Sequence, residues 1–376
     1  MKILFWSELY APKIGGIETI VRLIAEALVR AGHEAAVICN REPATLAAEE
    51  VINGVRVFRL GVERALARKD LPAFAGACRE MSRLRAEFQP DVEHVHTLGS
   101  LLVAFQMVRR GQPRPFAVSL HCTHDSLPGL VASGGAFLTT MREASRIVSL
   151  SEFLARHVRD LIPDVAARVQ TEYHGIPFPN AEPSPLPMNP PVVVSYGRLV
   201  PEKGFDLLLD AFAIVHREFS EVRLILGGDG PERARLLERA AQLHLGDAVE
   251  FRGWIEPARV PAFVNEGTLV IMPSRYAEPF GLVALDAAQM ARPVIATRNG
   301  GVPELVSEGE TGWLVENDSA PALAAALRLA LGDPARLQSL GTAARQRAAE
   351  RFGFERYFQF HLDLYRRVQS APISPA

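Results

Sequence analysis

The chain has 376 residues, of which 48% are hydrophobic, and its formal net charge is −2. This length favours two domains over one, and the near-neutral charge gives no electrostatic basis for binding nucleic acid. The three cysteines, Cys39, Cys78 and Cys122, are scattered and odd in number, which argues against a disulfide framework or a zinc site and favours a reducing compartment.

The chain opens with an apolar run at residues 2–7, which is too short for a signal peptide. No later run approaches the ~18 apolar residues that span a bilayer. We therefore expect a cytoplasmic protein, with peripheral contact at the inner face of the membrane as a further option.

Strand and helix patterns alternate through the first half of the chain. Strands are predicted at residues 2–7, 34–40, 55–60, 91–97, 116–121 and 147–151, and helices at 17–31 and 71–88. Such alternation is typical of a parallel sheet covered on both faces. Seven prolines then fall within residues 177–191 and exclude a helix or a central strand, so this segment is predicted to be a linker.

The alternation restarts after the linker. Strands are predicted at residues 192–196, 224–226, 249–253, 269–272, 294–297 and 313–315, and helices at 206–219, 232–245 and 320–351. The fold class is therefore α/β, with a first domain at 1–176 and a second at 192–353. The terminal segment, 354–376, begins with an aromatic-rich helical pattern that should dock on another surface, and we expect it to cross back to the first domain.

A loop after the predicted strand 269–272 carries the strongest candidate site. Glu278 lies in this loop, Phe280, Gly281 and Leu282 begin the next helix, and Asp286 follows on it. Parallel sheets bind ligands at this end of their strands, and amides at a helix N-terminus favour an anion. Two carboxylates and one anion site suit a phosphorylated sugar, although a solvated loop acid and a surface helix acid would give the same pattern.

Three further loops follow predicted strands. Arg198 and Lys203 flank a Pro/Gly turn, and two cations in one loop would neutralise a diphosphate. Gly15 and Gly16 would let the backbone approach a ligand, although a plain tight turn is the simpler explanation. A third loop, 226–231, contains three glycines and suits a structural turn and a ligand loop equally. No GxGxxG pattern occurs, which weakens an NAD-binding interpretation.

Histidines cluster in the first half of the chain. His94 and His96 share one face of a strand, so a metal site is an alternative, but no third ligand follows at a diagnostic spacing. His121 ends a strand, where its side chain would point into a crevice. A structural role for His121 is the competing interpretation, and His124 lies close enough to take its place.

Taken together, these loops resemble the retaining glycosyltransferases of the GT-B fold, in family 4. The resemblance covers nearly the whole chain. Its motifs are Gly15-Gly16 and residues 197–204, 228–231, 251–253, 273–286, 293–297, 300–306 and 311–312. It implies two Rossmann-like, doubly wound domains that face a deep cleft, with the acceptor bound by the first domain and a nucleotide-diphosphate sugar by the second.

The resemblance also implies roles for individual residues. His121, Glu278, Arg198 and Lys203 would be catalytic: His121 beside the transferred sugar, Glu278 on its hydroxyls, and the two cations on the diphosphate. The remaining donor contacts would be made by Gly15, Gly16, Gly253, Trp254, Phe280, Gly281, Leu282 and Asp286.

Within this pattern, Gly253 and Trp254 would contact the base, and Asp286 would bind the ribose. The family usually has Glu where this chain has Asp286, and glycine where it has Ala291-Arg292.

We expect transfer of a sugar from a UDP- or GDP-sugar to a sugar or lipid-linked acceptor, with retention and without an essential metal or other cofactor. Two alternatives are a GT-B sugar-nucleotide epimerase and a non-catalytic sugar-nucleotide-binding subunit. Mild basicity in residues 63–89 would suit an anionic membrane, although a solvated helix face explains it more simply. The sequence does not indicate the oligomeric state.

Overall fold

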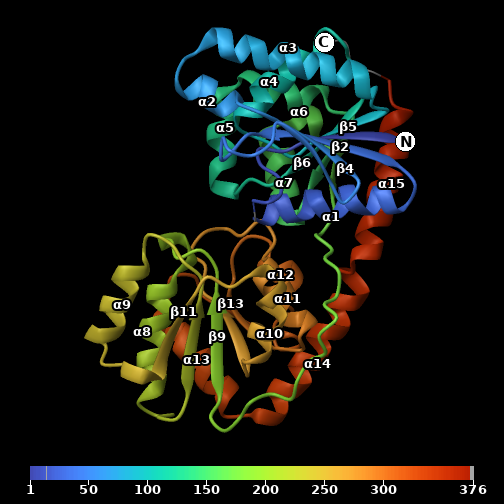
Figure 1. Ribbon diagram of the computed structural model, residues 1–376. Helices are drawn as coiled ribbons and strands as arrows, with labels where there is room; N and C mark the ends of the chain where they lie inside the picture. Colours follow the sequence, from blue (N-terminus) through green and yellow to red (C-terminus); the bar gives the residue numbers. More distant parts are fainter. Residues whose placement is uncertain (14, 373–376) are drawn as a thin grey trace. The chain divides into compact units, whose positions relative to one another are not determined.

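The structure is a computed structural model that describes residues 1–13 and 15–372 (Figure 1). The chain forms two compact units. The first contains Met1–Ile176 and the segment from Glu355 onward, and the second contains Pro177–Phe354. Within the described residues, no helix is both long and apolar enough to cross a membrane.

The first unit contains an eight-stranded sheet in the order β3-β4-β2-β1-β5-β6-β7-β8. Its strands are β1 (Lys2–Trp6), β2 (Glu34–Asn40), β3 (Glu49–Ile52), β4 (Val55–Leu60), β5 (Val92–Val95), β6 (Phe116–Leu120), β7 (Arg146–Ser149) and β8 (Val169–Thr171). All neighbouring strands are parallel except β3, which pairs antiparallel with β4 at the edge. The chain leaves β1 toward β2 on one side and later returns to β5 on the other, so the strand order reverses beside β1.

Helices flank both faces of this sheet (Figure 1). They are α1 (Gly16–Arg30), α2 (Val62–Ala67), α3 (Leu71–Phe88), α4 (Ser100–Arg109), α5 (Leu127–Ser133), α6 (Gly135–Glu143), α7 (Glu152–Leu161) and α15 (Phe354–Gln369). The terminal helix α15 buries the aromatic side chains of Tyr357, Phe358 and Tyr365 in this unit. Tyr365 Oη lies 2.9 Å from His94 Nδ1, and Tyr357 Oη lies 3.2 Å from His174 Nδ1. These hydrogen bonds explain how buried phenols on a terminal helix find partners.

The second unit contains a six-stranded parallel sheet in the order β11-β10-β9-β12-β13-β14. Its strands are β9 (Val192–Tyr196), β10 (Arg223–Gly227), β11 (Val249–Gly253), β12 (Leu269–Met272), β13 (Val294–Thr297) and β14 (Gly312–Val315). Its helices are α8 (Phe205–His216), α9 (Arg233–Gln242), α10 (Val260–Asn265), α11 (Leu282–Gln289), α12 (Val302–Leu305), α13 (Ala320–Leu331) and α14 (Pro334–Arg351). The predicted α/β class with two doubly wound sheets is confirmed.

The expected helix over 320–351 is in fact two helices. Asp333 caps the second, since its side chain accepts a hydrogen bond from Arg336 N, and Pro334 occupies the first helical position. The sequence did not predict two strands, β3 and β8, which lie at opposite edges of the first sheet. β3 begins with two polar residues and β8 is only three residues long, so neither gives a clear strand pattern in the sequence.

The proline-rich segment 177–191, which belongs to the second unit, is held to the rest of that unit by a buried arginine. Arg292 Nη2 donates to Ser184 Oγ and to the backbone oxygen of Asn265, both at 2.9 Å. Arg292 is fully buried, and this burial lowers its pKa to about 10. The side chain of Arg292 therefore links the irregular segment 177–191 to the ends of α10 and α11.

Ala291 itself stands in a left-handed conformation, with φ of 52°. It follows α11, where Ala291 N bonds Ala288 O at 3.0 Å and Arg292 N bonds Ala287 O at 2.9 Å. These two bonds form a helix-ending motif in which glycine is the favoured residue. The glycine that the family usually has near this position would meet that need without strain.

We therefore expect Ala291→Gly to stabilise the protein. Relief of the left-handed strain is worth roughly 1 kcal/mol, and the greater freedom of glycine in the unfolded chain removes part of this gain. The net increase in the free energy of unfolding should be about 0.5 kcal/mol, measured by urea unfolding. Ala325→Gly, at an exposed position inside α13, is the matched control and should cost about 1 kcal/mol. A loss of stability in Ala291→Gly would contradict this account.

Candidate active site

Two neighbouring loops meet at the point where the strand order of the second sheet reverses. One follows β9 and the other follows β12, and these strands pair directly through Val193 and Leu269. Gly204 in the first loop has a φ of 67°, and a Cβ there would collide with the carbonyl oxygen of Pro273 in the second. Doubly wound sheets bind ligands at such a reversal point, so both loops stand where a ligand is expected.

The two loops are joined by a network centred on Glu278. Lys203 Nζ lies 2.7 Å from Glu278 Oε1, and Ser274 Oγ donates to the same oxygen at 2.6 Å. Tyr276 Oη donates to Glu278 Oε2 at 2.5 Å and receives a hydrogen bond from Lys203 Nζ at 3.0 Å. Glu278 is only 6% exposed. Its charge is thus compensated by one ammonium group and two hydroxyls.

Burial, followed by the charge of Glu278, raises the pKa of Tyr276. The phenol therefore stays protonated and continues to donate to the carboxylate. The sequence pointed to Lys203 and Glu278, and the structure brings them into contact. It did not point to Ser274 or Tyr276, although both lie within four residues of Glu278.

The side chain of Arg198 differs from that of Lys203 in having no partner among the residues that the structure describes. This side chain is exposed, and its guanidinium group has no hydrogen bond or ion pair with the residues that the structure describes. Its positive charge nevertheless acts on Tyr276, where it opposes part of the rise in pKa that burial and Glu278 cause. Arg198 therefore presents an uncompensated charge beside the Glu278 network.

The loop after β13 holds the backbone of Glu278 in place. Gly301 N donates to Glu278 O at 2.8 Å. Gly300 has a φ of 60°, and a Cβ there would collide with the same carbonyl oxygen. Thr297, the last residue of β13, donates from Oγ1 to Ser274 O at 2.6 Å. Glycine at position 300 is thus required for close packing of the backbone against the candidate site, whereas Gly301 contributes only a backbone N–H.

Phe280, Gly281 and Leu282 form the start of α11. Gly281 precedes the helix with a φ of 106°. Phe280 is 2% exposed, and its ring packs edge-on against Phe352 with centroids 5.7 Å apart. Its side chain therefore belongs to the core, and only backbone groups at this helix end remain for an anion.

Asp286 is paired with a tyrosine that the sequence did not single out. Tyr196, the last residue of β9, donates from its hydroxyl to Asp286 Oδ2 at 2.5 Å. Burial raises the pKa of Asp286 to about 6, and the hydrogen bond from Tyr196 opposes this shift. Asp286 is thus a carboxyl group that changes charge just below neutral pH.

This shift makes a pH-dependent prediction for stability. A carboxyl group with an ordinary pKa of 3.8 in the unfolded chain and about 6 in the folded protein binds more protons when folded. Its contribution to stability is therefore present at low pH and is lost as the pH rises through about 6. The stability of the wild type relative to Asp286→Asn should fall by up to about 3 kcal/mol from pH 4 to pH 7. Urea unfolding of both proteins across this range tests it, and a constant difference would contradict the assignment.

Gly253 and Trp254 lie at the end of β11, two strands away from β9. Gly253 has a φ of 74° and open space where a Cβ would stand, and its carbonyl oxygen accepts a hydrogen bond from Gly228 N at 2.6 Å. Trp254 is 55% exposed, with its indole N–H bonded to Glu256 at 3.0 Å. Among the residues that the structure describes, no interaction joins either of them to the Glu278 network.

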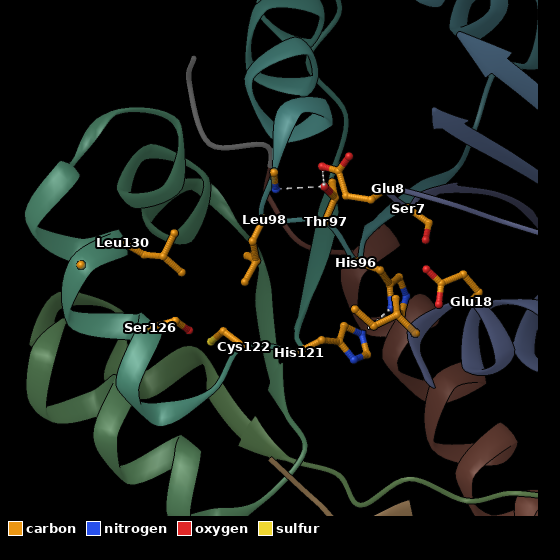
Figure 2. Close-up of a pocket in the computed structure, with 13 residues that line it drawn as sticks. Ser7, Glu8, Glu18, His96, Thr97, Leu98, His121, Cys122, Ser126 and Leu130 are labelled. Carbon is orange, nitrogen blue, oxygen red and sulfur yellow. Dashed lines mark hydrogen bonds between the residues drawn. The ribbon is translucent and has the colours of Figure 1, made fainter. Parts of the chain in front are cut away.

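The first unit contains a cavity of about 530 Å³ at the carboxyl ends of β1, β5 and β6 (Figure 2). It lies beside the point where the strand order of this sheet reverses. Its lining residues are Ser7, Glu8, Ile17, Glu18, His96, Thr97, Leu98, Gly99, His121, Cys122, Ser126, Gly129 and Leu130.

His121 lines this cavity as part of a stack of imidazoles. His121 Nε2 lies 2.9 Å from His96 Nδ1, and the ring of His121 stacks on His174 with centroids 5.7 Å apart. Burial lowers the pKa of His121 to about 4 and that of His96 well below its ordinary value. Both rings are therefore neutral at physiological pH.

The other two histidines that the sequence singled out, His94 and His124, contact side chains of the protein outside the cavity. His94 uses both ring nitrogens, bonding Tyr365 on one side and Ser119 on the other, each at 2.9 Å. His124 stacks on His157 with centroids 3.8 Å apart and does not line the cavity. Among the described residues, no group of three or more His, Cys, Asp or Glu could hold a metal ion.

Gly15 and Gly16 begin α1, as the motif predicts, but a carboxylate already occupies the adjoining space. A Cβ on Gly15 would collide with Glu18 Oε2. An anionic diphosphate at Gly15 would meet this charge. Glu18 lies two residues beyond the predicted motif. Its spacing puts it on the same helix face as Gly15, but the rotamer of its side chain brings the carboxylate to Gly15.

Two family models match the chain in succession. The model described as Glycosyltransferase Family 4 matches residues 14–178, and the model described as Glycosyl transferases group 1 matches residues 179–347. The glycogen synthase of Mycobacterium tuberculosis is 28% identical over 94% of this chain and 92% of its own length.

Two solved structures resemble the fold of the whole chain. The sucrose-phosphate synthase of Thermosynechococcus elongatus has a TM-score of 0.86 at 24% identity, covering 99% of this chain and 100% of its own. The HepE protein of Anabaena, in complex with UDP-glucose, has a TM-score of 0.80 at 23% identity, covering 97% of this chain and 99% of its own.

Proposed function

We propose a function for this chain from its family, because it belongs to glycosyltransferase family 4 and has the GT-B fold. In this proposal, the unit Pro177–Phe354 holds the sugar donor and the first unit holds the acceptor. The protein is an enzyme that transfers a sugar from a nucleotide-sugar donor to an acceptor with retention of anomeric configuration. The observation that carries the placement of the donor is the Glu278 network, with Lys203 at 2.7 Å and Arg198, whose side chain has no partner among the described residues, beside it.

The chemistry needs positive charge where the leaving group forms. Breaking the bond between the sugar and the diphosphate leaves negative charge on the diphosphate, and fixed positive groups at that position lower the barrier. Arg198 supplies a full charge, Lys203 supplies a charge shared with Glu278, and the backbone amides at Gly281 and Leu282 add a helix N-terminus. These groups replace a metal ion in the proposal.

Glu278 would act on the sugar rather than on the diphosphate. A carboxylate repels the anionic diphosphate but accepts hydrogen bonds from sugar hydroxyls. Its two oxygens are fixed by Ser274 and Tyr276, so their position is set before the donor arrives. Such preorganisation avoids the cost of ordering these groups during the reaction.

Asp286 would accept hydrogen bonds from the ribose hydroxyls in the same proposal. Its oxygen Oδ2 is held by Tyr196 at 2.5 Å, which leaves Oδ1 for the ligand. The shorter side chain of aspartate, in place of the family's usual glutamate, fits this direct contact with Tyr196. Gly253 and Trp254 would border the base.

UDP-glucose is the first donor to test, with GDP-sugars as the alternative, because UDP-glucose is the ligand of the HepE structure. Titration calorimetry of the full chain with UDP and GDP, in the presence of EDTA, tests donor binding without metal. NMR of the reaction with UDP-glucose then tests turnover and reports the anomeric configuration of the product. Binding that requires added magnesium would contradict the role given to Arg198 and Lys203.

We also propose that residues 63–89 contact an anionic membrane surface. Leu71 is 72% exposed beside the exposed cations Arg68 and Lys69. Two other cations of this segment already pair with carboxylates of the protein. Arg83 pairs with Glu80 and Glu87 on the surface, and Arg85 is buried against Glu93. Co-sedimentation with phosphatidylglycerol vesicles tests whether the chain, which is proposed to be cytoplasmic, meets a membrane surface there.

A further inference from the structure

The cavity of the first unit has a distinctive charge. The described residues that line it include two carboxylates, Glu8 and Glu18, and neither lysine nor arginine. The two histidines that line it are neutral at physiological pH. A bound phosphate or carboxylate would find no cation among these residues.

Glu8 is fully used in holding the ends of three strands together. It accepts hydrogen bonds from Asn40 Nδ2 at 2.6 Å, from Ser100 Oγ at 3.1 Å and from Leu101 N at 3.2 Å, and also from the hydroxyl of Thr97. These four donors occupy its lone pairs. Glu8 therefore shapes the cavity but has little capacity left for a ligand.

The side chain of Glu18, in contrast, has no hydrogen bond or ion pair with the described residues. It lies in the first turn of α1, half-buried, and Figure 2 shows its carboxylate on the same side of the cavity as His96 and His121. A half-buried carboxylate without a partner favours a cation or a hydroxyl donor as its neighbour.

His96 offers a second unused polar atom. Its side chain is 2% exposed, and Nε2 has no hydrogen-bond partner, while Nδ1 is taken by His121. Buried polar atoms are rarely left unpaired in native proteins. Whichever tautomer is present, this ring brings hydrogen-bonding capacity to the cavity without positive charge.

The remaining wall is apolar. Ile17, Leu98 and Leu130 line the cavity, and Leu98 and Leu130 stand opposite Glu18 in Figure 2. Sugar-like rings present a hydroxylated edge and an apolar face, so they match a cavity with polar groups on one side and aliphatic groups on the other.

We propose that this cavity binds an acceptor of the polyol or sugar class that is uncharged or bears an amine, and that it discriminates against phosphorylated acceptors through Glu18. The proposal rests on the proposed function, because it takes this cavity as the acceptor site of the transferase. Glu18 would be the residue that sets specificity, attracting an ammonium group and repelling a phosphate.

Three matched probes test the proposal: glucose, glucosamine and glucose 6-phosphate. Saturation-transfer NMR measures their binding to the full chain with UDP present in excess, so that the donor site is filled. We expect glucosamine and glucose to bind at least tenfold more tightly than glucose 6-phosphate. Glu18→Gln should lower glucosamine binding about tenfold and change glucose binding less than threefold, and Glu18→Lys should raise glucose 6-phosphate binding.

Glu63→Gln, at an exposed acid in the first turn of α2, is the matched control and should leave all three affinities unchanged. Tightest binding by glucose 6-phosphate, no detectable binding by any probe, or an unchanged order of affinities in both Glu18 variants would overturn the inference. Calorimetry with UDP distinguishes failure of the acceptor inference from failure of the proposed function. If UDP binds and the order is reversed, only this inference fails, and if neither UDP nor GDP binds, the proposed function fails with it.

Discussion

Replacement of Arg198 by alanine is expected to lower kcat/KM for the nucleotide sugar roughly a hundredfold and to leave the stability of the protein unchanged. The first effect follows because a cation aimed at the developing charge of the diphosphate is worth about 3 kcal/mol in the transition state. The second follows because Arg198 is exposed and has no partner among the described residues, and such surface substitutions change stability by less than about 0.5 kcal/mol.

Arg217→Ala is the matched control for this experiment. Arg217 is also exposed and follows the last turn of α8, so its loss removes the same charge from the unit. Steady-state kinetics and thermal unfolding should show both variants equally stable and only Arg198→Ala impaired. Equal kinetics in the two variants would mean that Arg198 has no special role.

Glu278→Gln and Asp286→Asn should separate the two acids by kinetic parameter. Glu278 is proposed to bind the sugar whose bond breaks, so its loss of charge should lower kcat about a hundredfold or more. Asp286 is proposed to bind the ribose, away from that bond, so Asp286→Asn should raise the donor KM with little change in kcat. Isothermal titration with UDP supports the division by reporting affinity directly. The opposite pattern would show that the two roles are exchanged.

The same Glu278 substitution should also destabilise the protein, because Lys203 would lose its carboxylate at 2.7 Å. Removing one partner of a largely buried ion pair costs several kcal/mol, and glutamine keeps part of the hydrogen bonding, so about 2 kcal/mol is expected. Lys203→Met in the Glu278→Gln background should recover part of this loss. A double-mutant cycle with no coupling would contradict the contact between the two loops.

The elements of both sheets were largely predictable because parallel strands that are buried on both faces read as apolar runs. Residues 34–40, 55–60, 192–196 and 269–272 were expected as strands with the bounds that the structure has. The edge strand β3 was missed because it begins with Glu49 and Glu50 and is exposed on one face. Helix α11 was expected to begin near Leu282, but Ala291 as its left-handed end was not, because alanine gives no signal for that conformation.

The candidate site was predictable only in part. Strand ends and glycine spacing indicated the loops that carry Arg198, Lys203 and Glu278. The sequence did not indicate Tyr196 and Tyr276, whose hydroxyls bind the two acids. Tyr196 bonds Asp286, which lies 90 residues later, and Tyr276 reaches Glu278 only through the turn of their shared loop. The placement of Glu18 against Gly15 likewise depends on a side-chain rotamer that spacing does not fix.

The most direct test of the central claim, that the donor lies at the loops after β9 and β12, is hydrogen exchange of the full chain measured with and without saturating UDP. We expect slower exchange in peptides that cover residues 197–204 and 273–286, with α13 (Ala320–Leu331) unchanged as an internal reference. GDP is tested in parallel for the case in which the base is guanine. Slower exchange confined to the first unit, or no change in either loop when the nucleotide is bound, would contradict the account.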